Sequence, residues 1–203
     1  MKPLVLLALS LTACAAPQKV SLADLTSVAH LSSLPSGAQV IESGQPLGHT
    51  PLDLPLRAGQ TYTLTLALPG FTSQLVSGDR AKLLGTNSGQ LGLVLVPSGY
   101  KPPGRLSLDD PRGLTALAGE VERRKDWGHA AEIWARVLVL RPRSPRAHKG
   151  MGSALAKLGR DEEAIRQYEQ YLFLEPDAPD AARVQRVIDA YRGGLDVRSG
   201  LEP

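Results

Sequence analysis

Two stretches of the sequence, AAEIWARVLVLRP at residues 130–142 and AIRQYEQYLFLEP at residues 164–176, carry the same pattern 34 residues apart. Each begins with alanine, has an aromatic residue four positions later and ends with a proline eight positions after that. The matching pairs are Ala130 and Ala164, Trp134 and Tyr168, and Pro142 and Pro176. A period of 34 residues predicts stacked helical hairpins, because one hairpin alone cannot bury its apolar face.

The residue types in this pattern suit closely packed helices. Alanine and glycine let paired helices approach, the aromatic ring fills the space between them, and a proline ends the second helix. Gly159 predicts the turn inside the second repeat, where the first repeat has Lys125. The pattern resembles the tetratricopeptide repeat (TPR). This resemblance implies two helical hairpins, at residues 111–144 and 145–178.

One more helix is expected after the two repeats. Two repeats rarely bury enough surface to be stable without a cap. Apolar residues at the helical spacing i, i+3, i+4 and i+7 predict a capping helix from about residue 179 to 192. These residues are Val184, Val187, Ile188 and Tyr191. Residues 194–203 are interpreted as a flexible tail.

The first half of the chain has a different character. Only nine of the 43 charged side chains lie in residues 1–100. TYTLTLAL at 61–68 alternates apolar and small polar residues with the period of two that is typical of a half-buried strand. Residues 38–42 and 91–96 predict two further strands, and the Pro- and Gly-rich residues 98–110 are interpreted as a linker. We therefore expect an α+β protein with the two classes in separate domains.

Residues 35–71, PSGAQVIESGQPLGHTPLDLPLRAGQTYTLTLALPGF, resemble the PEGA domain, a small β module of bacterial and archaeal envelope proteins. Ser36 replaces the glutamate that gives the family its name. The resemblance implies a compact, antiparallel β-sandwich-like domain, which we place at residues 28–97. It implies no chemistry, because the module has no active site common to the family.

The N-terminal residues have the pattern of a secretory signal. Lys2 precedes PLVLLALSL, an apolar run that is too short to span a membrane and suits a secretory signal. The run ends Leu11-Thr12-Ala13-Cys14, which resembles the bacterial lipobox. That resemblance implies cleavage after residue 13 and lipid on Cys14, the only cysteine, followed by a tether at residues 14–27. An ordinary signal with an incidental cysteine is the alternative. Ala15 favours an outer-membrane or cell-surface location.

No constellation for catalysis is apparent in the sequence. The four histidines are scattered, and no nucleotide-binding, metalloprotease or serine-hydrolase motif occurs. The single cysteine excludes a CxxC zinc or redox site, and a net charge of +3 gives no argument for nucleic acid. Asp161-Glu162-Glu163 is interpreted as a helix start. We expect a protein that is not an enzyme and needs no cofactor or metal.

The charges of the repeats instead point to binding. In a TPR array the first helix of each repeat lines a concave groove, and the resemblance places a mostly basic set of side chains there. The set is Arg112, Arg123, Arg146, Lys149, Ser153 and Lys157, with Arg183 from the capping helix. Such a groove favours an acidic protein or peptide partner. The alternative is an ordinary solvated face of a basic protein.

Together these features predict a membrane-anchored envelope lipoprotein that acts as a protein-interaction scaffold. Two alternatives stay open at this point. The first is an assembly factor for a pilus or secretion complex that resembles pilotins, although pilotins lack a β module and have longer repeat arrays. The second is a regulatory subunit of a cell-wall enzyme.

Overall fold

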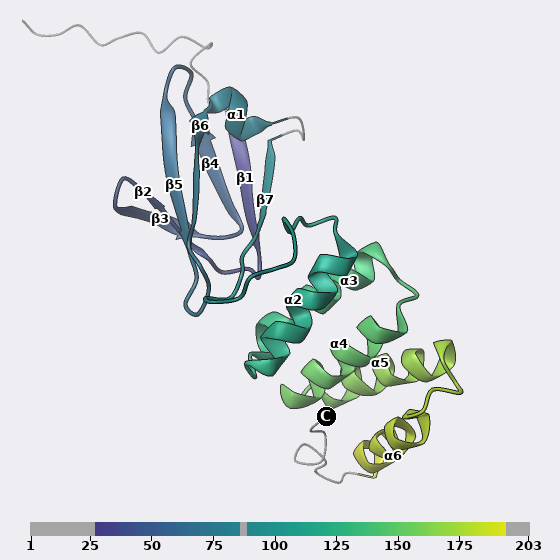
Figure 1. Cartoon of the computed structure of the whole chain (residues 1–203). Coiled ribbons are helices and arrows are strands. Elements are labelled where there is room, and N and C mark those ends of the chain that lie inside the picture. The colour runs from purple at the N-terminus through teal and green to yellow at the C-terminus, as the bar shows by residue number, and fades with distance from the viewer. Residues whose placement is uncertain (1–26, 86–88, 194–203) are drawn as a thin grey trace, which may run out of the picture.

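The computed structural model describes residues 27–85 and 89–193. It has a β domain followed by a row of helices (Figure 1). The expected fold class, with strands and helices in separate domains, is confirmed. The expected signal segment, Cys14, residues 14–26 of the expected tether and the expected tail at 194–203 lie outside the described residues. None of the described helices is both long and apolar enough to cross a membrane.

The β domain consists of two sheets. The first has the order β4-β1-β7 and the second the order β3-β2-β5-β6. Their strands are β1 (Ser27–Leu34), β2 (Gln39–Glu42), β3 (Gln45–His49), β4 (Leu52–Leu56), β5 (Thr61–Ala67), β6 (Gln74–Asp79) and β7 (Gln90–Val94). A short helix, α1 (Arg80–Leu84), follows β6.

The strand expected from strict alternation is β5. Tyr62, Leu64 and Leu66 are buried in the core, whereas Thr61 and Thr63 are exposed. β2 and β7 are the other two expected strands. All strand pairs among the described residues but one are antiparallel. The exception is β1, which pairs with β7 in parallel, with His30 opposite Gln90. The expected antiparallel domain is confirmed except at this pair, which could not be foreseen because a strand's own sequence does not specify the direction of its neighbour.

Five helices form the second domain. They are α2 (Pro111–Arg123), α3 (Trp127–Leu140), α4 (Pro145–Lys157), α5 (Asp161–Leu174) and α6 (Ala181–Arg192). Asp110 caps α2 and Ser144 caps α4, each followed by a proline in the first turn. The turns inside the two repeats lie at Lys125 and Gly159, both with positive φ. The expected equivalence of these two positions is confirmed.

Each helix packs against the next along the chain (Figure 1). Trp134 and Tyr168 are buried, as expected of the aromatic position. The ring of Tyr168 lies close against Gly152, and that of Trp134 against Gly150, so neither glycine has room for a β-carbon. α6 covers α5 with Val184 and Ile188, so it forms the expected capping helix.

The two domains share a contact surface. The Ser36 N–H donates to Glu132 Oε2 of α3 at 2.7 Å, and Arg124 Nη1 donates to the Ser98 carbonyl at 2.9 Å. The rings of Phe71 and His129 meet edge-on, with centroids 5.4 Å apart. Buried residues of both domains belong to one continuous core.

The segment interpreted as a linker is itself fastened to the helices. Residues 98–110 contain no helix or strand. Arg136 of α3 donates to the Leu108 carbonyl and to Asp109, each at 2.7 Å. Leu106 and Leu108 also pack against the core. The segment therefore joins the domains without separating them.

Candidate functional site: a groove between the helices

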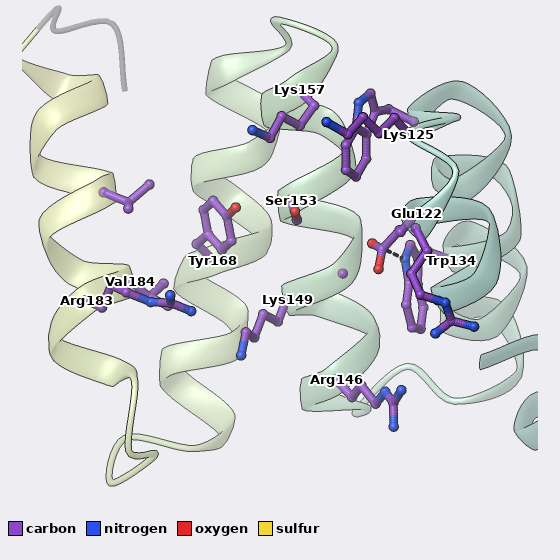
Figure 2. Close-up of a pocket in the computed structure, with 15 residues that line it drawn as sticks. Glu122, Lys125, Trp134, Arg146, Lys149, Ser153, Lys157, Tyr168, Arg183 and Val184 are labelled. Carbon is purple, nitrogen blue, oxygen red and sulfur yellow. Dashed lines mark hydrogen bonds between the residues drawn. The ribbon is translucent and has the colours of Figure 1, made fainter. Parts of the chain in front are cut away.

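A groove runs between α2, α4 and α6 (Figure 2). Its volume is about 640 Å³. We call it the repeat groove. Its lining consists of Gly119, Glu122, Arg123, Lys125, Trp127, Trp134, Arg146, Lys149, Gly150, Ser153, Lys157, Tyr168, Arg183, Val184 and Val187. The size is in the range of ligand-binding clefts.

The repeat groove brings together most of the side chains chosen from the sequence. Arg123, Arg146, Lys149, Ser153, Lys157 and Arg183 all line it. Arg112 does not. It is exposed in the first turn of α2, where its N–H binds the capping Asp110. It lies 11 residues before Arg123, which is about 16 Å along the helix. The residues of α2 that line the groove lie in its second half, at Gly119, Glu122 and Arg123.

Aromatic side chains form a wall that the sequence did not predict as part of the site. Trp134 and Tyr168 were assigned to packing alone, but both also line the repeat groove. Trp127, the first residue of α3, adds a third ring and was not singled out. The only signal for Trp127 is its place directly after the turn between α2 and α3, at the end of the hairpin. Both tryptophans of the chain therefore line one groove.

Among the described residues that line the groove, Glu122 is the only one with a carboxylate. Its Oε1 accepts a hydrogen bond from the Trp134 indole N–H at 2.8 Å (Figure 2). Burial raises the pKa of Glu122, while the Trp134 hydrogen bond and the charge of Arg146 oppose the rise. This half-buried acid therefore orients Trp134 and partly offsets the positive charge of Arg146.

Lys149 lines the groove but is already engaged by a carboxylate of the protein itself. Its Nζ lies 2.6 Å from Asp180 Oδ2 and 5.6 Å from the centre of the Tyr171 ring. Tyr171 also donates a hydrogen bond to Asp180, and Arg183 lies 3.8 Å from the same carboxylate. Lys149, followed by the Tyr171 hydrogen bond, lowers the pKa of Asp180. This cluster joins the start of α6 to α4 and α5, so Lys149 has a structural partner.

The remaining cations differ in how strongly they are engaged. Arg123 pairs with Glu120 on its own helix but keeps 69% of its side chain exposed. Lys157 lies over the Trp127 ring, 5.9 Å from its centre. Arg146 is exposed and forms no ion pair with any residue in the ranges 27–85 and 89–193. Arg146 is therefore the cation best placed to meet an anionic partner.

Chemistry other than binding has little support in this part of the chain. Within the described residues, no three histidine, cysteine, aspartate or glutamate side chains cluster as metal ligands do. The titratable residues of the groove are one carboxyl, one buried phenol and several cations. Burial raises the pKa of that phenol, Tyr168, which keeps it neutral. The arrangement is suited to holding a ligand rather than to acid–base catalysis.

The fold and the groove define a β domain joined to a TPR-type helical array. Comparison with known families supports both halves: residues 26–76 match the PEGA domain, and residues 120–189 match the tetratricopeptide repeat. No curated protein matches the chain. Both family resemblances found in the sequence are thus confirmed. Repeats of the second kind typically bind proteins, so the helical domain is a protein-interaction module.

Proposed function

We propose that this protein is a non-enzymatic scaffold of the bacterial cell envelope. A lipid on Cys14 anchors it to a membrane, with the outer membrane or cell surface favoured, and the repeat groove captures an acidic partner protein. Support for the capture step comes from the groove itself, where exposed Arg146 and Arg123 lie beside an aromatic wall. Support for the anchor is the sequence Leu11-Thr12-Ala13-Cys14.

Groove binding is tested by crosslinking in cells followed by pulldown from membranes. Arg146→Glu reverses the charge of the most available groove cation. Arg112→Glu is the matched control, because Arg112 occupies the same repeat position 34 residues earlier and lies outside the groove. We expect partner recovery to fall at least tenfold for Arg146→Glu alone. Equal recovery from both variants and the wild type would show that the partner binds elsewhere.

The anchor needs its own experiment. We expect the wild-type protein to incorporate an alkyne-labelled fatty acid and to enter the detergent phase on extraction. Cys14→Ser should do neither, since acyl chains attached at Cys14 would supply the membrane affinity. Labelling of Cys14→Ser equal to that of the wild type would exclude this residue as the lipid site.

The pilotin-like role and the cell-wall-enzyme subunit remain alternatives from the sequence. No feature within residues 27–85 and 89–193 favours either of them over a general scaffold. We therefore keep the groove-dependent scaffold as the function to test.

A further inference from the structure

We propose that the repeat groove recognises an acidic segment that carries one bulky apolar side chain between its acidic residues. The apolar side chain enters the groove as an anchor, and the flanking carboxylates meet the cations at its edges. This proposal rests on the function proposed above and specifies what that partner must present.

The need for an apolar anchor follows from the walls of the groove. The Trp127 ring lies beside Lys157. Tyr168 and Val184 line the side that α6 forms (Figure 2). Val187 of α6 adds a partly exposed aliphatic surface. Tyr168 and Val184 are themselves buried, whereas Trp127 and Val187 are partly exposed, and acidic side chains alone would leave that exposed apolar surface in water. Burying one phenylalanine or leucine side chain there contributes roughly 1.5–3 kcal/mol, about 10- to 150-fold in affinity.

The floor of the groove leaves space for such an anchor. Gly119, Gly150 and Ser153 have no side chain or a small one, so they take up little of the groove, whose volume is about 640 Å³. Gly119 faces open space, because a β-carbon added there would meet nothing within 4 Å. Gly150 differs, since Trp134 already occupies that space. The opening is therefore bounded by α2 at Gly119 and by the aromatic wall.

The charges set the chemistry on either side of the anchor. Figure 2 shows Lys157 near one end of the groove and Arg146 near the other. Glu122, the one carboxylate among the described lining residues, accepts a hydrogen bond from Trp134 and is offset by the charge of Arg146. A ligand with lysine or arginine beside its anchor would meet like charges at both ends. A ligand with aspartate or glutamate would be attracted at both.

End-blocked peptides of five residues test the proposal directly. The three probes have phenylalanine between pairs of aspartates, alanine between pairs of aspartates, and phenylalanine between pairs of lysines. Because both tryptophans of the chain line the groove, a change in tryptophan emission reports occupancy of this site. The purified full-length protein in non-ionic detergent is titrated with each peptide up to millimolar concentration.

Two variants with matched controls separate the anchor from the charges. Gly119→Leu fills the open space, and Gly128→Leu is its control. Gly128 is also helical, an added β-carbon there meets nothing within 4 Å, and it lies outside the groove. Arg146→Glu reverses the edge charge, with Arg112→Glu as its control. Thermal unfolding of each variant confirms that the fold is retained.

We expect the acidic phenylalanine peptide to bind at least tenfold more tightly than the other two, and to be weakened by Gly119→Leu and Arg146→Glu only. Equal affinity of the phenylalanine and alanine peptides would overturn the apolar anchor and leave a groove that recognises acidic segments by charge alone. If the lysine-flanked peptide bound as tightly as the aspartate-flanked phenylalanine peptide, the proposed preference for acidic flanking residues would be overturned.

Binding of none of the three peptides would overturn this inference. If Arg146-dependent crosslinking in cells persisted in that case, the proposed scaffold function would stand. If crosslinking were also independent of Arg146, both proposals would fail.

Discussion

At the residue scale, two glycines of the repeat groove have opposite surroundings. A β-carbon on Gly150 would lie 2.3 Å from Trp134 Cε2, a distance that requires the ring to move. A β-carbon on Gly119 would meet nothing. Substitution at Gly150 tests the close packing against Trp134, whereas substitution at Gly119 tests only the low helix propensity of glycine.

We predict that Gly150→Ala destabilises the protein by about 1–3 kcal/mol, because overpacking displaces a buried indole. Gly119→Ala should instead stabilise it by up to about 1 kcal/mol, since alanine is the better helix former. Urea unfolding followed by circular dichroism measures both. A Gly150→Ala variant as stable as Gly119→Ala would show that the Trp134 ring can shift without cost.

Glu122 makes stability depend on pH in a direction that follows from its surroundings. Its pKa is raised in the folded state from an ordinary value of 4.5. The stability linked to this group is therefore present below its ordinary pKa and is lost as pH rises through the folded value. Glu122→Gln keeps an oxygen for the Trp134 N–H and cannot ionise. We expect its unfolding free energy at pH 7 to equal or exceed that of the wild type.

Glu122→Ala is the contrasting variant, because it leaves the indole N–H of Trp134 without its partner. We expect a loss of about 1–2 kcal/mol relative to Glu122→Gln. Unfolding curves at pH 4 and pH 7 for all three proteins test this. Equal stabilities of the glutamine and alanine variants would mean that the hydrogen bond contributes nothing.

At the element scale, the attachment of α6 depends on a small polar cluster as well as on apolar packing. Asp180 directly precedes the helix, and its carboxylate forms an ion pair with Lys149 and accepts a hydrogen bond from the Tyr171 hydroxyl. Burial, followed by the bond to Asp180, raises the pKa of Tyr171 to about 12. The cluster lies beside the repeat groove, so loss of α6 would remove one of its walls.

We predict that Asp180→Asn loosens α6 more than the preceding helices. Because the folded pKa of Asp180 is lowered from 3.8, its contribution is present above that value and is lost as pH falls through the lower folded value. With 21% of this side chain and 42% of Lys149 exposed, we expect only about 1 kcal/mol. Hydrogen exchange should show faster exchange in residues 181–192. Unchanged exchange there would assign the attachment to Val184 and Ile188 alone.

At the scale of the whole molecule, the two domains are expected to unfold together. Ser36 with Glu132 and Phe71 with His129 join them, and the core is continuous across the contact. We predict that Phe71→Ala combined with Glu132→Ala separates one unfolding transition into two. It should also increase protease cleavage within residues 98–110. Tryptophan emission reports the helices alone, and far-ultraviolet circular dichroism reports both domains. Coincident curves in the double variant would contradict this coupling.

The sequence predicted best what recurs at short range. The 34-residue period identified the buried positions of Trp134 and Tyr168, and strict alternation identified the inward residues of β5. Contacts between distant segments produce no periodic pattern in the sequence. The parallel pairing of β1 with β7 and the engagement of Lys149 by Asp180 could not be predicted for that reason. Repeat position placed Arg112 in the groove, whereas the lining of the repeat groove does not include it.

The length of β1 holds the first described residue at a fixed distance from the contact with the helical domain. This strand starts at Ser27 and ends at Leu34, just before the turn in which Ser36 contacts Glu132. Its eight residues span about 23 Å from first to last. An anchor attached before Ser27 would therefore hold the helices at a distance, with the β domain as a stiff spacer. A partner of the proposed anchored protein would then have to reach past the β domain to meet the repeat groove.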